Sequence, residues 1–430
     1  MDIRLEKPFE KSIEIEAISS KSFVHRLLIA AALDGSKRKI ITNIFPEDMK
    51  ATMNCLNALG ADVRMEEDGF VIYAGVSFCE NAVLDCNESG STARFIMPLS
   101  AVFCKSAKLI GRGKLPKRPN EALCRELRKN GADIDSDFLP TTVSGVLKSG
   151  EYTLPGNVSS QFITGLIIAL PLIDGDSILN IDGKLESAGY VDITCEVLKQ
   201  FGIRIKRNEN KFIIPGNQKY FCKAEGNIIA EGDWSNSAYV LGMGALGADV
   251  LIKGLNVYST QPDMACLELI KNFGAKLEIE KVTDKLSNIR VKRAELHGIT
   301  VDVSQIPDLV PALAVIASFA DSDSVFLNVN RLRIKESDRV ESIMRLLSSY
   351  GIGCETKIDG ESEQLIVHSG NIDVSDWDVD SYNDHRIVMA ATMAFIGRNI
   401  NADDFAAMMI KRADAVNKSY PDFFNIMELV

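Results

Sequence analysis

A phrase that recurs five times along the chain constrains the fold more than any other feature of the sequence. Each copy is an amphipathic segment followed by a glycine and a short alternating run. The copies read CLNALGADVRM, LCRELRKNGADID, CEVLKQFGIRI, CLELIKNFGAKLEI and IMRLLSSYGIGCE, and their glycines are Gly60, Gly131, Gly202, Gly274 and Gly351. The glycines are spaced 71, 71, 72 and 77 residues apart, which predicts a structural unit repeated at about this length.

The phrase is interpreted as a helix that ends at its glycine, followed by a strand. Glycine suits this place because it adopts the positive φ with which many helices end. Between the phrases, residues 159–172 predict a buried helix that begins at Ser159 and Ser160. Strands that close a unit are predicted at 68–75, 210–216 and 363–370. A unit with two helices and several strands indicates an α/β (α+β) fold class.

Six units are expected, although the last copy is incomplete. Residues 418–430 begin a sixth phrase, but its glycine and strands do not follow. Near the N-terminus, IRLEKP and SIEIEA are strand candidates that could supply the missing part. Both ends of the chain would then complete one domain, which makes that domain discontinuous.

Six units divide into two groups of three, and the chain has to cross between the groups twice. The crossings are expected near 17–20 and near 227–232. Just after the second crossing, EGDWSNSAYVL predicts a new helix capped by Asp233 or Ser235. The predicted domains are residues 1–18 plus 230–430, and an inserted domain of residues 19–229. Three consecutive domains are the alternative.

Composition excludes several classes of function. A formal net charge of −11 repels nucleic acid and anionic membranes, so neither is expected as a partner. Nine scattered cysteines without a CxxC pair, and four histidines, disfavour a disulfide scaffold or a zinc site and fit the cytoplasm. The uncharged apolar stretch 309–320 is far shorter than the ~20 residues of a membrane span. The N-terminal run MDIRLEKPFE has no apolar signal-peptide core.

Cations and hydroxyls recur at predicted helix starts in the first half of the chain. SSKSFVHRLL places a lysine, a serine and an arginine at such a start, and NESGSTARF is a Gly/Ser-rich turn that leads into a helix. A helix N-terminus with hydroxyls and cations is suited to bind phosphate. The basic loop GRGKLPKRPNEAL precedes a helix expected near Pro119, and Ser187 and Tyr190 are expected in a second polar loop before the helix that ends at Gly202. The candidate residues here are Lys21, Ser22, Arg26, Gly90, Arg118, Ser159, Ser160, Gln161, Ser187 and Tyr190.

The second half adds acids to the same pattern. RLRIKESDRVESI brings Lys335, Glu336 and Arg339 to a helix start, at the place in the repeat that Arg118 and Tyr190 occupy earlier. Asp308 lies between two prolines ahead of an apolar helix, as a cap or as a proton acceptor. YNDHRIVMAATMAF contributes Arg386, and Lys418 occupies the corresponding place in the sixth phrase. Several cations gathered at helix N-termini predict a small ligand with several negative charges.

These motifs resemble the EPSP synthase family of enolpyruvyl transferases, the 3-phosphoshikimate 1-carboxyvinyltransferases. The resemblance covers nearly the whole chain in order, through SSKSFVHR, ESGSTARF, LPKRP, SSQFITGL, SAGYVDIT, GDWSNSAY, PDLVPALA, RIKESDR, NDHR and NKSYPDFF. It implies a two-domain inside-out α/β barrel of six βαβαββ units, three per domain, with the active site in the interdomain cleft. It also implies transfer of the enolpyruvyl group of phosphoenolpyruvate to the 5-hydroxyl of shikimate 3-phosphate, with release of phosphate. No metal or organic cofactor is implied, and a monomer is expected.

The resemblance also implies roles for individual residues. Asp308 and Glu336 would carry protons through a tetrahedral addition–elimination intermediate, with Lys21 nearby, and which acid serves which step stays open. Tyr190 would pack against the shikimate ring. Residues on the shikimate 3-phosphate side would be Lys21, Ser22, Arg26, Ser159, Ser160, Gln161, Ser187, Tyr190, Asp308 and Lys335. Residues on the phosphoenolpyruvate side would be Lys21, Gly90, Arg118, Gln161, Arg339, Arg386 and Lys418.

Some positions depart from the family pattern. Glu88 and Ser91 stand where many members have small or neutral residues, and Glu88 adds a negative charge near a phosphoenolpyruvate contact. Three alternatives remain open. The first is the sister enzyme that acts on UDP-N-acetylglucosamine, although many of its members use a cysteine in the loop that matches 111–120, which has none here. The others are an RNA 3′-phosphate cyclase, which the net charge disfavours, and a non-catalytic anion-binding protein.

Overall fold

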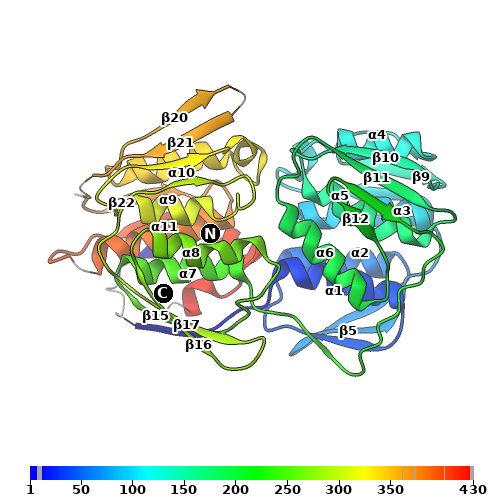
Figure 1. The fold of residues 1–430 in the computed structure, drawn as a ribbon, viewed down its shortest axis with the longest axis horizontal. Helices are drawn as coiled ribbons and strands as arrows, with labels where there is room; N and C mark the ends of the chain where they lie inside the picture. Colours follow the sequence, from blue (N-terminus) through cyan, green and yellow to red (C-terminus); the bar gives the residue numbers. More distant parts are fainter. Residues whose placement is uncertain (7–11, 361, 371, 373, 401, 427–430) are drawn as a thin grey trace. The chain divides into compact units, whose positions relative to one another are not determined.

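A computed structural model describes residues 1–6, 12–360, 362–370, 372, 374–400 and 402–426 (Figure 1). The chain forms two compact units. The first, called the outer unit, consists of Met1–Ile18 and Glu231–Val430, and the second, called the inserted unit, consists of Ser19–Ala230. None of the helices in the described ranges has the length and apolar character needed to cross a bilayer.

The five phrase glycines end helices, as their sequence pattern predicts. Their φ angles are 87°, 97°, 77°, 109° and 86° in chain order, all in the left-handed region. The helices before them are α2 (Glu47–Ala58), α4 (Glu121–Lys129), α6 (Ala188–Gln200), α8 (Cys266–Asn272) and α10 (Arg339–Ser349). The strands after them are β4 (Asp62–Glu66), β8 (Ala132–Ile134), β12 (Lys206–Asn208), β16 (Lys276–Lys281) and β20 (Cys354–Asp359).

Each unit holds three small sheets within the described residues. In the inserted unit the first order is β14 (Ile228–Ile229), β3 (Arg38–Ile41), β5 (Gly69–Ala74), β4. The second is β6 (Cys79–Asp85), β7 (Cys104–Ile110), β9 (Thr141–Gly145), β8. The third is β10 (Glu151–Pro155), β11 (Ser177–Asp182), β13 (Lys211–Ile214), β12. In all three the first pair is parallel and the other pairs are antiparallel.

The outer unit repeats this arrangement. Its first two sheets have the orders β2 (Ser12–Glu16), β15 (Asp249–Leu255), β17 (Ser287–Lys292), β16 and β18 (Thr300–Asp302), β19 (Ser324–Leu327), β21 (Ser362–Val367), β20. The third joins β22 (Trp377–Asp380), β23 (Met408–Lys411) and β1 (Ile3–Leu5). The two N-terminal strands therefore serve different sheets, because β1 pairs with β23 and β2 pairs with β15.

The helix expected over 418–430 is short. Lys418 ends a 3-10 turn, η5 (Ala413–Lys418), and up to residue 426, where the description ends, only α12 (Phe423–Ile426) is helical after it. Residues 427–430 lie outside the described residues. The remaining 3-10 turns are η1 (Leu115–Lys117), η2 (Leu170–Leu172), η3 (Pro262–Ala265) and η4 (Asn330–Ile334).

Buried helices form the core of each unit, and the sheets lie outside them, which is the inside-out α/β fold. In the outer unit, α7 (Trp234–Leu246), α9 (Val310–Ala317) and α11 (His385–Asn399) pack pairwise against one another (Figure 1). Every residue of α7 and α9 is buried. In the inserted unit the corresponding helices are α1 (Lys21–Asp34), α3 (Gly90–Phe103) and α5 (Ser160–Ala169). Such helices can be apolar all round because protein covers every face.

Candidate functional site

A carboxylate surrounded by cations lies at the start of α9 in the outer unit. The Asp308 carboxylate is 2.7 Å from the Arg339 guanidinium, 3.2 Å from that of Arg386 and 3.4 Å from the Lys335 ammonium. Burial raises the pKa of Asp308, but the charges of Arg386, Lys335 and Arg339 outweigh burial and leave this pKa well below its usual range. Asp308 is therefore ionised at neutral pH.

Arg339 links this carboxylate to two further acids. It is the first residue of α10, its side chain is 1% exposed, and its guanidinium contacts Glu336 at 2.7 Å and Asp384 at 2.9 Å. Asp384 is fully buried, caps α11 by accepting from the Arg386 backbone N–H, and also accepts from the Ser337 hydroxyl at 3.0 Å. Burial lowers the pKa of Arg339, but the negative charges of Asp384, Glu336 and Asp308 outweigh burial and raise this pKa well above its usual value. The guanidinium therefore stays charged.

The last two predicted cations of the outer unit adjoin the same group. Arg386 donates to the backbone carbonyl of Ser235 at 3.2 Å, and Lys418 donates to the backbone carbonyl of Asn383 at 2.8 Å. The structure thus brings together Asp308, Lys335, Glu336, Arg339, Arg386 and Lys418 from four separate stretches of the chain. We call these six residues the acid–cation cluster.

In the inserted unit, Lys21 is the first residue of α1. Its ammonium forms an ion pair with Asp48 of α2 at 2.9 Å, and both side chains are less than one-fifth exposed. Sequence reasoning missed Asp48, whose only signal was its place in the first turn of a helix.

Arg26 lies one turn further along α1 and is held by neutral acceptors. It donates to the Thr194 hydroxyl at 2.7 Å, to the Thr164 hydroxyl at 3.4 Å, and to the backbone carbonyls of Ser22 and Tyr190 at 2.7 and 2.9 Å. No carboxylate in the described part of the chain forms an ion pair with it. Burial lowers the pKa of Arg26 to about 10. A buried guanidinium without a carboxylate partner favours an anion nearby.

The start of α3 is enclosed by cations. A side chain at Gly90 would come within 2.5 Å of the Arg94 guanidinium and 2.8 Å of that of Arg118, so only glycine leaves both in place. Arg94 also donates to the Gln161 carbonyl at 2.9 Å, and the Gln161 amide donates to Ser91 at 3.1 Å. The Glu88 carboxylate lies close against Gly113 of the basic loop, where a β-carbon would come within 2.6 Å of it.

The remaining candidates lie at the starts of α5 and α6. Ser159 caps α5 by accepting from the Gln161 N–H at 3.3 Å, and Ser160 is buried behind it. Ser187 precedes α6 with a φ of 54°. The expectation that Tyr190 lies in a loop is wrong, because α6 begins at Ala188 and Tyr190 belongs to its first turn. Similarly, the helix expected near Pro119 begins two residues later, at Glu121.

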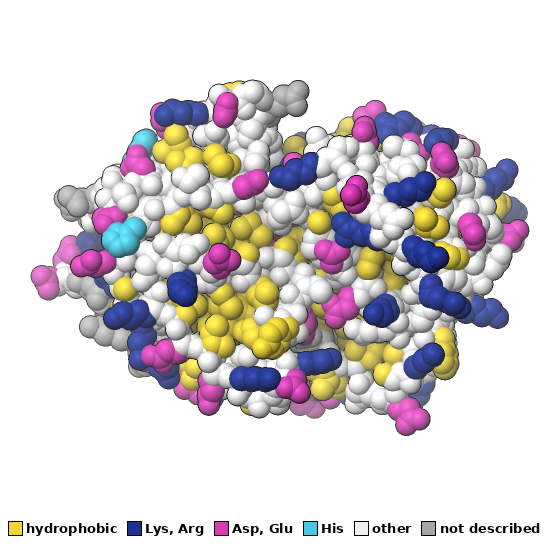
Figure 2. Space-filling view, in the orientation of Figure 1, with side chains coloured by type: hydrophobic (Ala, Val, Ile, Leu, Met, Phe, Trp, Pro, Cys, Tyr) yellow, Lys and Arg dark blue, Asp and Glu magenta, His cyan; other side chains and the backbone are white. Residues whose placement is uncertain are grey.

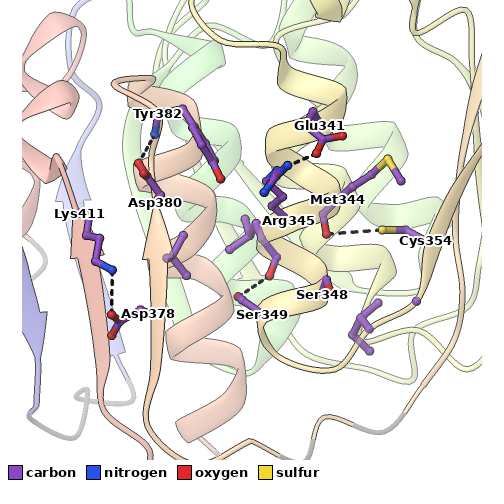
Figure 3. Close-up of a pocket in the computed structure, with 14 residues that line it drawn as sticks. Glu341, Met344, Arg345, Ser348, Ser349, Cys354, Asp378, Asp380, Tyr382 and Lys411 are labelled. Atoms are coloured by element: carbon purple, nitrogen blue, oxygen red, sulfur yellow. Dashed lines mark hydrogen bonds and ion pairs between the residues drawn. The ribbon is translucent and has the colours of Figure 1, made fainter.

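A pocket of about 640 Å³ lies elsewhere on the outer unit, between α10, β20 and β22 (Figure 3). Two pairs of charged side chains drawn there form ion pairs, Arg345 with Glu341 at 2.7 Å and Lys411 with Asp378 at 3.0 Å. None of its lining residues belongs to the acid–cation cluster. Figure 2 shows basic and acidic side chains interspersed over the visible face, without one extended basic patch.

Comparisons with known proteins agree on one family. A family model described as EPSP synthase (3-phosphoshikimate 1-carboxyvinyltransferase) matches residues 5–427. The 3-phosphoshikimate 1-carboxyvinyltransferase of Clostridium novyi (strain NT) is 37% identical over 436 residues, covering 98% of this chain and 96% of that protein. That of Clostridioides difficile (strain 630) is 35% identical, with the same coverage of 98% and 96%. A solved EPSP synthase structure from Acinetobacter baumannii shares the fold, with a TM-score of 0.79 at 23% identity over 99% of this chain and 97% of that one.

Proposed function

The chain belongs to the EPSP synthase family, and from this premise we propose how its own residues perform the reaction. The enzyme, a 3-phosphoshikimate 1-carboxyvinyltransferase (EC 2.5.1.19), transfers the enolpyruvyl group of phosphoenolpyruvate to the 5-hydroxyl of shikimate 3-phosphate. Phosphate is released, and the product serves the shikimate pathway of aromatic amino-acid biosynthesis. The sister enzyme acting on UDP-N-acetylglucosamine is not favoured.

The observation that carries the proposal is the Asp308 carboxylate with three cations around it. Both substrates carry a phosphate and a carboxylate, so each needs several cations. When anions bind beside Arg339 and Arg386, they offset part of the positive field that lowers the pKa of Asp308. Asp308 then becomes a stronger base at the moment when both substrates are present.

We assign the proton transfers on this basis. In the addition step, the 5-hydroxyl oxygen bonds to C2 of phosphoenolpyruvate and gives its proton to Asp308, while Glu336, protonated beforehand from solvent, gives a proton to the methylene carbon. In the elimination step, the new methyl group returns a proton to Glu336, the C–O bond to phosphate breaks, and the departing phosphate takes the proton held by Asp308. Glu336, which shares Arg339 with Asp308, handles the proton at carbon, and Lys21 compensates negative charge on the intermediate.

The substrate contacts fall into two sets, one for shikimate 3-phosphate and one for phosphoenolpyruvate. Shikimate 3-phosphate is bound by Lys21, Ser22, Arg26, Ser159, Ser160, Gln161, Ser187, Tyr190, Asp308 and Lys335. Phosphoenolpyruvate is bound by Lys21, Gly90, Arg118, Gln161, Arg339, Arg386 and Lys418. These sets draw on both units, so we propose that the active site forms in a cleft where the units close on the substrates. Closure would exclude water and strengthen every contact with the anions.

The decisive experiment is phosphate release by the purified protein with both substrates, and with each omitted in turn. Release is expected only with both, and release without shikimate 3-phosphate would refute the transfer. Closure is tested separately by small-angle scattering, in which saturating shikimate 3-phosphate should reduce the radius of gyration. An unchanged radius would refute a site shared by the two units.

We also propose that the protein acts as a monomer in the cytoplasm. One chain supplies both sets of contacts, and all nine cysteines, which lie within the described ranges, are free thiols. Light scattering coupled to gel filtration tests the first part, since an active dimer at assay concentrations would contradict it.

A further inference from the structure

A chain of buried hydrogen bonds crosses three helices of the inserted unit. His25 Nδ1 of α1 lies 2.7 Å from the Thr52 hydroxyl of α2, which lies 2.8 Å from the Thr92 hydroxyl of α3. Thr92 donates to the Ser89 hydroxyl at 2.8 Å, and Ser89 caps α3. His25 is 1% exposed, and the other three side chains are fully buried.

The direction of these bonds follows from their last member. Because Thr92 donates to Ser89, its hydroxyl accepts from Thr52, which in turn accepts from His25. His25 therefore carries its proton on Nδ1, and its Nε2 has no hydrogen-bond partner in the described part of the chain. Burial, followed by the charges of Lys21 and Arg26, lowers the pKa of His25 well below its usual value, so the ring is neutral.

This series of hydrogen bonds lies beside the ion pair formed by Lys21. Lys21 and His25 are one turn apart on α1, and their partners Asp48 and Thr52 are one turn apart on α2. The helices α1 and α3 each pack against α2. The bonds made by Thr52 therefore join the helix start that carries Lys21 to the one that carries the Ser89 cap.

The last residue in this series of hydrogen bonds, Ser89, lies next to the cations at the start of α3. Ser89 immediately precedes Gly90, against which the guanidinium groups of Arg94 and Arg118 lie. A shift at the start of α3 would therefore move the backbone on which these cations rest. Lys21 and Arg118 both stand on the phosphoenolpyruvate side of the proposed site.

We propose that Thr52 is a positioning residue that fixes the start of α1 relative to the start of α3, and so holds Lys21 and Arg118 at the separation that phosphoenolpyruvate requires. Thr52 touches no substrate and acts through His25 and Thr92. This inference rests on the proposed function. It predicts that the hydroxyl of residue 52, and not merely its volume, governs the affinity for phosphoenolpyruvate.

The test compares Thr52→Val with Thr52→Ser. Valine keeps the shape but leaves the His25 N–H without an acceptor and removes the bond from residue 52 to the Thr92 hydroxyl, which keeps its bond to Ser89, whereas serine keeps the hydroxyl. We expect Thr52→Val to raise the KM for phosphoenolpyruvate about tenfold, equivalent to about 1.4 kcal/mol, with a change below about threefold in kcat. Thr52→Ser should return this KM to within about twofold of the wild-type value.

The matched control is Thr392→Val in α11 of the outer unit. Thr392 is equally buried, and among the described residues its hydroxyl bonds only to the Val388 carbonyl of its own helix. It should leave the KM for phosphoenolpyruvate unchanged. Thr92→Val breaks the same chain from α3, so it should reproduce the Thr52→Val kinetics and decides the question if Thr52→Val is poorly folded.

Wild-type turnover is measured first, so that the two ideas fail separately. Absence of phosphate release by the wild type refutes the proposed function, and binding of phosphoenolpyruvate by calorimetry then tests Thr52 by itself. The positioning role of Thr52 is refuted if Thr52→Val lowers the melting temperature of the protein while the KM for phosphoenolpyruvate stays within twofold of wild type. A serine variant that fails to restore that KM would overturn it as well.

Discussion

Replacing Asp308 by asparagine isolates the charge of one carboxylate from its shape. Asparagine keeps an oxygen that can accept from Arg339, but it removes the negative charge that Lys335 and Arg386 also face. Arg339 retains Glu336 and Asp384 as partners. The perturbation therefore falls on proton transfer and on two cations, and the acid–cation cluster otherwise stays assembled.

Magnitudes follow from these contacts. A positioned acid or base contributes about 10²- to 10⁴-fold to rate, or about 3–5 kcal/mol in the barrier, so kcat of Asp308→Asn should fall by that factor. Affinity for shikimate 3-phosphate should stay within about tenfold of wild type. Removal of the carboxylate makes the net charge of the acid–cation cluster more positive, and this offsets a lost hydrogen bond to the substrate. Loss of one partner from a buried ion pair costs about 3–5 kcal/mol, and the remaining partners of Arg339 place the expected loss of unfolding free energy near the lower end.

The pH dependence of that stability difference has a definite sign. The folded-state pKa of Asp308 lies below its ordinary value of 3.8. Its ion pairs therefore stabilise the protein fully at pH values above 3.8, and the contribution is lost as the pH falls through the folded-state pKa. The gap in unfolding free energy between wild type and Asp308→Asn should be constant from about pH 5 to 8 and shrink in stronger acid.

The rate of phosphate release gives kcat, and calorimetry gives the affinity for shikimate 3-phosphate. Urea unfolding gives the free energies of unfolding. Glu336→Gln serves as a comparison, since it should also retain binding and lose turnover. A kcat for Asp308→Asn within tenfold of wild type would refute the role of this carboxylate as a proton acceptor. A stability gap that widens in acid would refute the argument about its charge.

Three further substitutions test other parts of the site. Arg118→Ala should raise the KM for phosphoenolpyruvate at least tenfold more than that for shikimate 3-phosphate, and equal effects would contradict the assignment. Gly90→Ala places a β-carbon within 2.5 Å of Arg94 and 2.8 Å of Arg118, so it should raise the same KM about tenfold; an unchanged value would show that both guanidinium groups move aside freely. Asp384→Ala removes the α11 cap and the fully buried partner of Arg339, so urea unfolding should show a loss of about 3–5 kcal/mol, and a loss below about 1 kcal/mol would contradict the structural role.

Local pattern was sufficient to predict much of the architecture. The helix ends at the five phrase glycines could be predicted because a helix that ends at a positive φ has a sequence signature of three or four adjacent residues, as at Gly60 and Gly274. Asp233 was likewise predictable as a cap, and it does accept from the Asn236 N–H at the start of α7. Tyr190 was misplaced because Gly189 weakens the helical pattern of its segment, and burial of the following turns supplies the stability that the pattern lacks.

Partners between distant stretches could not be read from the sequence. Asp48 lies 27 positions from Lys21, and Asp384 lies 45 positions from Arg339. Each acid also has a sufficient local explanation, as a residue in the first turn of α2 or as the cap of α11. Only the packing of α1 on α2, and of α10 on α11, shows that these carboxylates face a cation. The same holds for Thr52, whose neighbours in sequence give no sign of His25.

The pairing of β1 with β23 affects the order in which the protein is completed during translation. The inserted unit contains all of its own strands by Ala230, so it can fold while the rest of the chain is still being synthesised. Strand β1 is made before the inserted unit, yet it stays unpaired until Met408–Lys411 has left the ribosome. At about 5–20 residues per second, the roughly 200 residues after Ala230 take about 10–40 s to synthesise. A nascent chain therefore carries a complete inserted unit and an unpaired β1 for most of that interval, although β2 gains its partner β15 early.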